Sequence, residues 1–120
     1  MGCVFMDSSD IRVLQKLRKH TQAIMKYCAG CRTLDEFEAD SMCVEATVFN
    51  LMQIGALAKI SLREEAKSQI PAIPWKQLYG LRNRIVHGYD GVSMQIVWDT
   101  VTEDIPILDD PLRRAISENT

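Results

Sequence analysis

The residues best suited to chemistry lie in one eleven-residue stretch, Tyr79-Gly-Leu-Arg-Asn-Arg-Ile-Val-His-Gly-Tyr89. It combines two arginines, an amide and one of the two histidines in the chain. An imidazole can move a proton at neutral pH. A guanidinium can hold two phosphate oxygens and stabilise the charge that develops on them. Together these groups suit metal-free cleavage of RNA, in which the 2′-hydroxyl attacks the adjacent phosphorus.

Helical spacing decides which of these side chains can meet. Asn83 and His87 are four residues apart and share a helix face, with Arg84 beside them. Arg82 precedes His87 by five residues, which is about 140° around an ideal helix. Arg82 therefore reaches the imidazole only through its long side chain, a distorted helix end near Gly88, or a second subunit. A twofold dimer would also supply the second acid or base that the motif lacks.

The bare pair of Arg82 and His87 also has an ordinary explanation. Such spacing arises by chance, and helix C-termini favour cationic side chains in any protein. A helix-end histidine and a surface arginine would look the same.

The net charge of the chain disfavours non-specific binding of nucleic acid. The 14 Lys and Arg are outnumbered by 16 Asp and Glu, for a formal net charge of −2. Any RNA contact must come from a local cluster, and Lys76, Arg82 and Arg84 form the predicted one.

The chain of 120 residues, 47% of them hydrophobic, fits one domain over residues 1–120 with flexible ends at about 1–6 and 110–120. We expect no apolar run that approaches the length of a membrane span. The N-terminus lacks the basic start of a signal peptide. These features predict a cytoplasmic protein whose four cysteines are reduced.

The apolar pattern predicts an all-α protein, an antiparallel bundle of about five helices. A helix of about 20 residues should follow the caps at residues 7–9 and stop near Gly30. Thr33-Leu-Asp-Glu36 is a capping box that leads through a short helical turn into a second long helix, about 41–60. That second helix is apolar on almost every side, which is typical of a helix central to a bundle or buried against a second subunit.

Prolines and caps delimit the C-terminal half. Pro74 suits the first turn of the helix that carries the motif, from Trp75 to about His87. Ser93 can cap a final helix, which Pro106 ends or kinks. The tail from Asp109 is polar.

The motif and its surroundings resemble a known family. The residues Ile73-Pro-Trp-Lys-Gln-Leu-Tyr-Gly-Leu-Arg-Asn-Arg-Ile-Val-His-Gly-Tyr89 resemble the signature of HepT-like proteins of the HEPN superfamily, roughly I-P-W-x-x-[IL]-x-G-[LM]-R-N-x-x-x-H-x-Y. The resemblance continues through Gln95-Ile-Val-Trp98 and Asp104-Ile-Pro-Ile-Leu108. Upstream, Gln53-Ile-Gly-Ala-Leu-Ala-Lys59 resembles the I-G-x-A-x-K helix of the family. The match covers roughly residues 50–108.

The resemblance implies an all-α homodimer whose R-x4-H-x-Y motif lines a cleft between subunits. It implies that Arg82 and His87 are the ribonuclease residues, with Asn83 as their polar companion. It implies that Tyr89 is modified with AMP by a minimal nucleotidyltransferase antitoxin of the MntA type. Such a protein is the endoribonuclease toxin of a bacterial type VII toxin–antitoxin system, acting on tRNA or mRNA. Bulky anionic nucleotides beside the cleft would repel RNA.

One residue departs from the pattern and keeps an alternative open. Many relatives carry an acidic residue after the glycine of the I-G-E-A-x-K helix, where this chain has Ala56. If that carboxylate orients the Arg or His, this chain is a weak or inactive nuclease that serves as a scaffold for a nucleotidyltransferase. A helical dimerisation module with no active site is a third possibility.

No metal or cofactor is predicted. Cys28-Ala-Gly-Cys31 ends a helix, whereas redox pairs of this kind begin one. Structural zinc needs four ligands, and the sequence offers no second pair nearby.

Overall fold

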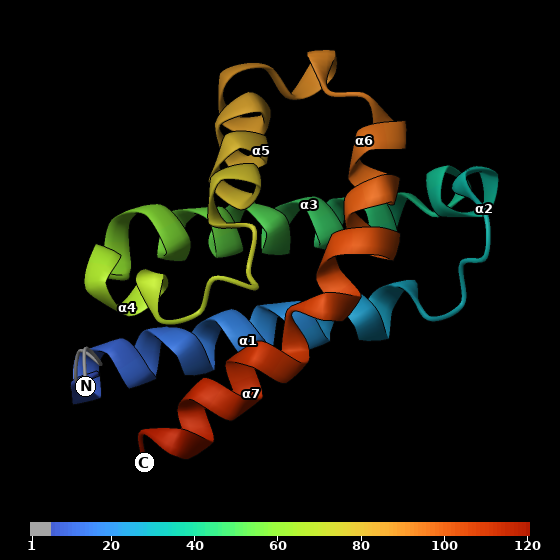
Figure 1. Cartoon of the computed structure of the whole chain (residues 1–120). Helices are drawn as coiled ribbons and strands as arrows, with labels where there is room; N and C mark the ends of the chain where they lie inside the picture. Colours follow the sequence, from blue (N-terminus) through green and yellow to red (C-terminus); the bar gives the residue numbers. More distant parts are fainter. Residues whose placement is uncertain (1–5) are drawn as a thin grey trace.

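A computed structural model of the protein describes residues 6–120 except for the side chain of Tyr89 (Figure 1). The described residues form helices and connecting loops with no strand, which confirms the predicted all-α fold. The α-helices are α1 (Ser8–Cys28), α2 (Leu34–Ala39), α3 (Ser41–Ala56), α4 (Glu64–Ser68), α5 (Trp75–Gly88), α6 (Met94–Asp99) and α7 (Asp109–Glu118). Short turns of other helical types are η1 (Leu57–Ser61), η2 (Tyr89–Gly91), η3 (Thr100–Asp104) and η4 (Ile105–Ile107).

The predicted caps begin α1 and α2. Asp7 accepts from the backbone N–H of Asp10 at 2.8 Å, and the Asp10 carboxylate accepts in return from the N–H of Asp7 at 3.1 Å. Thr33 accepts from the N–H of Glu36 at 3.2 Å, while the Glu36 carboxylate accepts from the N–H of Arg32. These bonds satisfy N–H groups that a helix start leaves without partners.

α3 is the central helix. It packs against α1 on one side and α5 on the other, and with η1 it continues to Ser61, close to the predicted end at residue 60. The stretch Ser41–Ser61 is long and apolar enough to cross a membrane by length and composition, with a mean hydropathy of 1.3, so the expectation of no such run is wrong. Half of that window is buried inside the protein, as in a core helix.

α5 and α6 run across the direction of α1 and α3 (Figure 1). They are joined at their far ends through η2, so the end of α5 stands at a tip of the molecule. Ser93 caps α6 by accepting from the N–H of Gln95 at 3.2 Å, as predicted.

The residues from Asp109 are polar as predicted, but the flexible end expected at about 110–120 is wrong, because these residues form α7. Pro106 lies in η4, a single 3-10 turn that precedes α7. α7 lies along α1 with Leu112 and Ala115 buried. Arg18 of α1 donates to the Asp109 carboxylate at 2.9 Å. Residues 110–120 are thus mostly part of the fold. Of the other predicted flexible end, residues 1–5 lie outside the described residues, and Met6 is buried.

Candidate active site

α5 presents two different faces. Its buried side chains, Leu78, Leu81 and Ile85, recur every three or four residues and pack into the core. Of the polar side chains of the motif that fall between them, Arg84 and His87 are exposed, whereas Arg82 and Asn83 are half-buried. Pro74 precedes the first turn, where the absent N–H would have had no helical partner. The core therefore fixes α5 and leaves its motif accessible.

Gly55 of α3 lets α5 approach closely at Arg82. A Cβ added to Gly55 would overlap the Cβ of Arg82 and lie 2.9 Å from its Cγ. It would also lie 3.1 Å from the backbone oxygen of Leu78. The stem of Arg82 therefore rests on the bare backbone of α3. This role of Gly55 was not predicted from the sequence, although its place in the I-G-x-A-x-K pattern was a signal.

Arg82 and Asn83 form a pair at this point. The Arg82 Nη1 donates to Asn83 Oδ1 at 3.3 Å, and both side chains are half-buried. An arginine carries five donors, so most of the guanidinium is left to bind a further group. A phosphate is a suitable acceptor, because its oxygens match the fork of the guanidinium.

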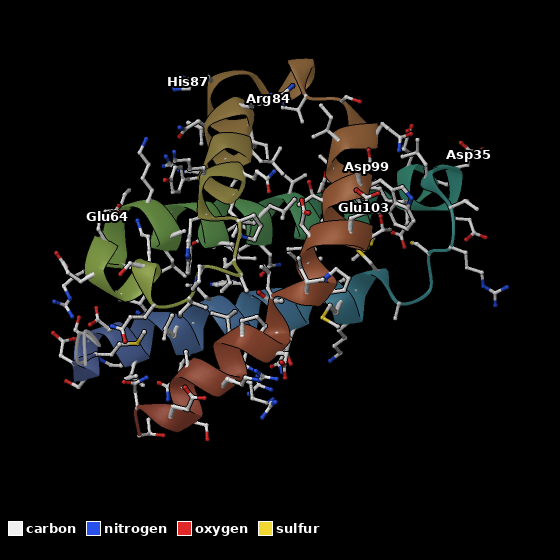
Figure 2. The ribbon with its side chains drawn as sticks, in the orientation of Figure 1. Asp35, Glu64, Arg84, His87, Asp99 and Glu103 are labelled. Atoms are coloured by element: carbon white, nitrogen blue, oxygen red, sulfur yellow. The ribbon has the colours of Figure 1, made fainter. Side chains whose placement is uncertain are left out.

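His87 stands one helical turn beyond Asn83. It is exposed in the last turn of α5, and Figure 2 shows it at the outer end of the helix, directed away from α6. Arg82, Asn83 and His87 thus lie on the accessible part of one helix. Arg82, which can bind an anion, is hydrogen-bonded to Asn83, and Asn83 precedes His87, which can transfer a proton, by one helical turn.

The predicted basic cluster of Lys76, Arg82 and Arg84 is spread around α5. Arg84 lies on the side that faces α6 (Figure 2), where it lines a hollow of about 400 Å³ with Asp99 and Asp104. Burial, and then the charge of Asp99, raises the pKa of Asp104. Lys76 lines a different hollow, near α4. Arg84 therefore has acidic neighbours, and Lys76 has the less acidic surroundings.

Tyr89 is the first residue of η2, two residues beyond His87. Its side chain lies outside the described part of the structure. The backbone places this position at the same tip of the molecule as His87.

The three described cysteines and the second histidine lie elsewhere in the fold. Cys28, Cys31 and Cys43 are free thiols, and burial raises the pKa of the Cys31 and Cys43 thiols, which disfavours the reactive thiolate. His20 hydrogen-bonds through Nδ1 to Oδ1 of Asn50 at 2.8 Å. Within residues 6–120, no three His, Cys, Asp or Glu side chains are grouped so that they could hold a metal ion.

Comparison with known proteins links the chain to one family. The profile of a family described as Ribonuclease HepT-like matches residues 17–115. A "Putative RNase" of Caldanaerobacter subterraneus is 29% identical over 72% of this chain and 76% of its own length. A "Putative RNase" of Methanocaldococcus jannaschii is 35% identical over 62% of this chain and 60% of its own. A "Probable ribonuclease HepT" of Thermococcus cleftensis is 29% identical over 76% of this chain and 90% of its own. No solved structure matches.

Proposed function

The chain belongs to the HepT-like ribonuclease family, and on that premise we propose that it is an endoribonuclease that cleaves RNA without a metal ion. The observation that supports this most directly is the placement of Arg82, Asn83 and His87 on the accessible part of α5. Their chemistry covers phosphate binding, positioning and proton transfer.

In the proposed reaction the 2′-oxygen attacks the neighbouring phosphorus, and the bond from phosphorus to the 5′-oxygen breaks. The products are a 2′,3′-cyclic phosphate and a 5′-hydroxyl. Arg82 binds the non-bridging oxygens and stabilises the charge that grows on them. Asn83 holds the guanidinium in place through its hydrogen bond. His87 carries one of the two protons that must move, either from the 2′-hydroxyl or to the 5′-oxygen.

A homodimer supplies the second proton-transfer group. One imidazole cannot be base and acid in the same step, so the His87 of a second copy would take the other role. Large apolar side chains are left exposed on α3 and η1, namely Met42 at 80%, Phe49 at 57% and Ile60 at 72%. These exposed apolar side chains would suit an interface with a second copy.

Regulation would act at Tyr89. We propose that the protein is the toxin of a toxin–antitoxin pair and that a MntA-like nucleotidyltransferase attaches AMP to this tyrosine. The position is two residues from His87. Added phosphate would repel the RNA backbone beside Arg82 and His87. RNA, as tRNA or mRNA, would be bound in the cytoplasm with help from Lys76 and Arg84.

The test is cleavage of a mixed tRNA pool in the presence of EDTA. We expect the wild type to cut, and His87→Ala and Arg82→Ala each to lose about 100-fold or more in rate, the usual contribution of a positioned acid–base or charged group. His20→Gln is the matched histidine control and should cut normally. Equal rates for wild type, His87→Ala and Arg82→Ala would refute these catalytic assignments. Protein modified at Tyr89 by a candidate antitoxin should be inactive.

A second function is favoured by Ala56. Ala56 is half-buried and follows Gly55, on which Arg82 rests. Because the residue is an alanine, no carboxylate is present at this position to pair with Arg82. The protein would then be a catalytically weak scaffold that binds the nucleotidyltransferase. Cleavage of RNA by the purified chain in EDTA would exclude this function, whereas no cleavage even at high protein concentration would favour it.

A further inference from the structure

A hollow of about 620 Å³ lies between α4 and the start of α5. Its size is within the range of about 300–1,000 Å³ that is common for ligand pockets. Its lining is mainly apolar and aromatic, with two lysines and one carboxylate. The principal residues are Glu64, Lys67, Pro74, Trp75, Lys76 and Tyr79.

One wall of this α4–α5 hollow is held rigidly. The Trp75 Nε1 donates to the backbone oxygens of Lys67 at 3.2 Å and Ile70 at 3.1 Å. These bonds fix the indole and tie α5 to the end of α4. The hollow is therefore shaped before any ligand arrives, which lowers the free-energy cost of binding.

Lys67 places a buried positive charge in the hollow. The side chain is 5% exposed, and its Nζ lies 3.0 Å from Oε1 of Glu64 and 5.5 Å from the centre of the Tyr79 ring. Lysines are rarely buried to this degree unless they are paired. The Glu64 partner is 82% exposed. An ammonium has three donors, so Lys67 can also donate to an oxygen of a ligand.

The lining of the hollow reaches Tyr79, which lies two helical turns before His87 on α5. Tyr79, Asn83 and His87 follow one another at intervals of four residues and share a helix face. Tyr79 is about 12 Å from His87 along the helix axis, at 1.5 Å per residue. Glu64 and His87 lie on the same side of α5, away from α6 (Figure 2). A strand whose phosphate is at His87 can thus place a neighbouring nucleotide at Tyr79.

We propose that the α4–α5 hollow binds one unstacked nucleobase of the RNA substrate, which packs on Tyr79 and accepts a hydrogen bond from Lys67. Lys76, exposed at the rim, contacts the phosphate of that nucleotide. This inference rests on the proposed ribonuclease function and gives that site a base-binding position. Aromatic rings and flat apolar walls are the usual means of binding bases of single-stranded RNA.

The test is a binding measurement, so it does not depend on cleavage. A labelled ten-nucleotide RNA of mixed sequence is titrated with protein that carries His87→Ala, and fluorescence anisotropy gives the Kd. Added Tyr79→Leu should weaken binding about 5- to 100-fold, the effect of one base stacked on an aromatic ring. Tyr79→Phe keeps the ring and should restore binding. Tyr27→Leu, at a 51% exposed tyrosine of α1, is the matched control and should bind normally.

A second arm identifies the base. The same RNA is made with one abasic nucleotide at each position in turn. At one position of the RNA, removal of the base should weaken binding to the protein that keeps Tyr79. The same removal should not weaken binding to the protein with Tyr79→Leu. The proposal would be overturned if the proteins with Tyr79 and with Tyr79→Leu bound the RNA with equal Kd values. It would also be overturned if no single abasic position weakened binding. A Tyr79→Leu protein whose oligomeric state changes while RNA binding does not would overturn it too, since the hollow would then hold protein.

The two proposals can fail separately. If the base-binding proposal is wrong, RNA binding survives Tyr79→Leu while cleavage by the wild type still requires His87. If the catalytic assignment is wrong, His87→Ala does not slow cleavage, but Tyr79→Leu still weakens binding.

Discussion

At the residue scale, Gly55 controls the position of Arg82. We expect Gly55→Ala to push the stem of Arg82 and the backbone at Leu78 away from α3. Overpacking of this kind costs about 1–3 kcal/mol, and a displacement near 1 Å in a catalytic group can cost about 100-fold in rate. Urea unfolding and RNA cleavage measure the two effects.

The control is a glycine on the helix that carries the motif. A Cβ added to Gly80 meets nothing within 4 Å, so Gly80→Ala should stabilise α5 by about 0.5–1 kcal/mol through helix propensity. Its cleavage rate should stay unchanged. If Gly55→Ala cleaves as fast as the wild type, close packing at Gly55 is not what positions Arg82.

Ala56 is the second informative position. It follows Gly55, on which Arg82 rests. We expect the carboxylate of Ala56→Glu to hold the Arg82 guanidinium more firmly. The kcat should rise about tenfold, the effect of one charged hydrogen bond of about 1.5 kcal/mol. Ala56→Gln has the same size without the charge and should gain less. Single-turnover cleavage compares the three proteins. A slower Ala56→Glu would mean that the carboxylate competes with phosphate for Arg82.

Part of this candidate site could be predicted from the sequence. Helical spacing predicts that Asn83 and His87 share a face and that Arg82 does not, because spacing along one helix is a local property. It could not show that Arg84 lies among Asp99 and Asp104, because those carboxylates come from α6 and η3. Nor could it show the hollow at Tyr79, which depends on how α4 packs against α5.

At the element scale, an ion pair joins the first turn of α1 to the start of α4. Arg63 donates to both carboxylate oxygens of Asp10, with Nε 3.1 Å from Oδ1, and Asp10 is only 2% exposed. The hydrogen bonds and charge of Arg63 hold the pKa of Asp10 below its usual 3.8. We expect Arg63→Met to lower the free energy of unfolding, because it leaves a buried carboxylate without its charged partner.

The pH dependence of that loss has a definite sign. A carboxylate whose pKa is lower in the folded state stabilises the protein above the unfolded pKa. That stabilisation disappears as the pH falls through the folded pKa. The gap between wild type and Arg63→Met in urea unfolding should therefore be widest near neutral pH and narrow below pH 3.8. Arg113→Met, which removes an exposed pair with Asp110, should show little change at any pH.

Element boundaries were predictable where a cap or an apolar period marked them. The caps Asp7, Thr33 and Ser93 each begin a helix as expected. α7 was missed because most of its residues are polar, and its apolar face becomes evident only when α1 covers Leu112. Helix η1 extends α3 by a π turn, a local widening that sequence period does not reveal.

At the scale of the whole molecule, the described structure leaves apolar side chains uncovered on one face of α3. Met42, Phe49 and Ala56 recur every seven residues and so lie along one face. The face runs to the position beside Gly55, where Arg82 rests. A second copy packed there would bury Phe49 and bring its own α5 near the first. We expect the dimer that the proposed reaction needs to form on this face.

We therefore expect sedimentation equilibrium to give twice the mass of the 13.6 kDa chain for the wild type. Phe49→Glu should have the mass of a monomer, because a buried charge without a partner opposes association. Phe49→Glu should remain folded, since Phe49 is already 57% exposed in the single chain. Its cleavage rate should fall about 100-fold with loss of the second proton-transfer group. Ile107→Glu, at a 53% exposed position in η4, should stay dimeric and active. A monomeric Phe49→Glu that still cleaves RNA at the wild-type rate would place both proton transfers within one chain.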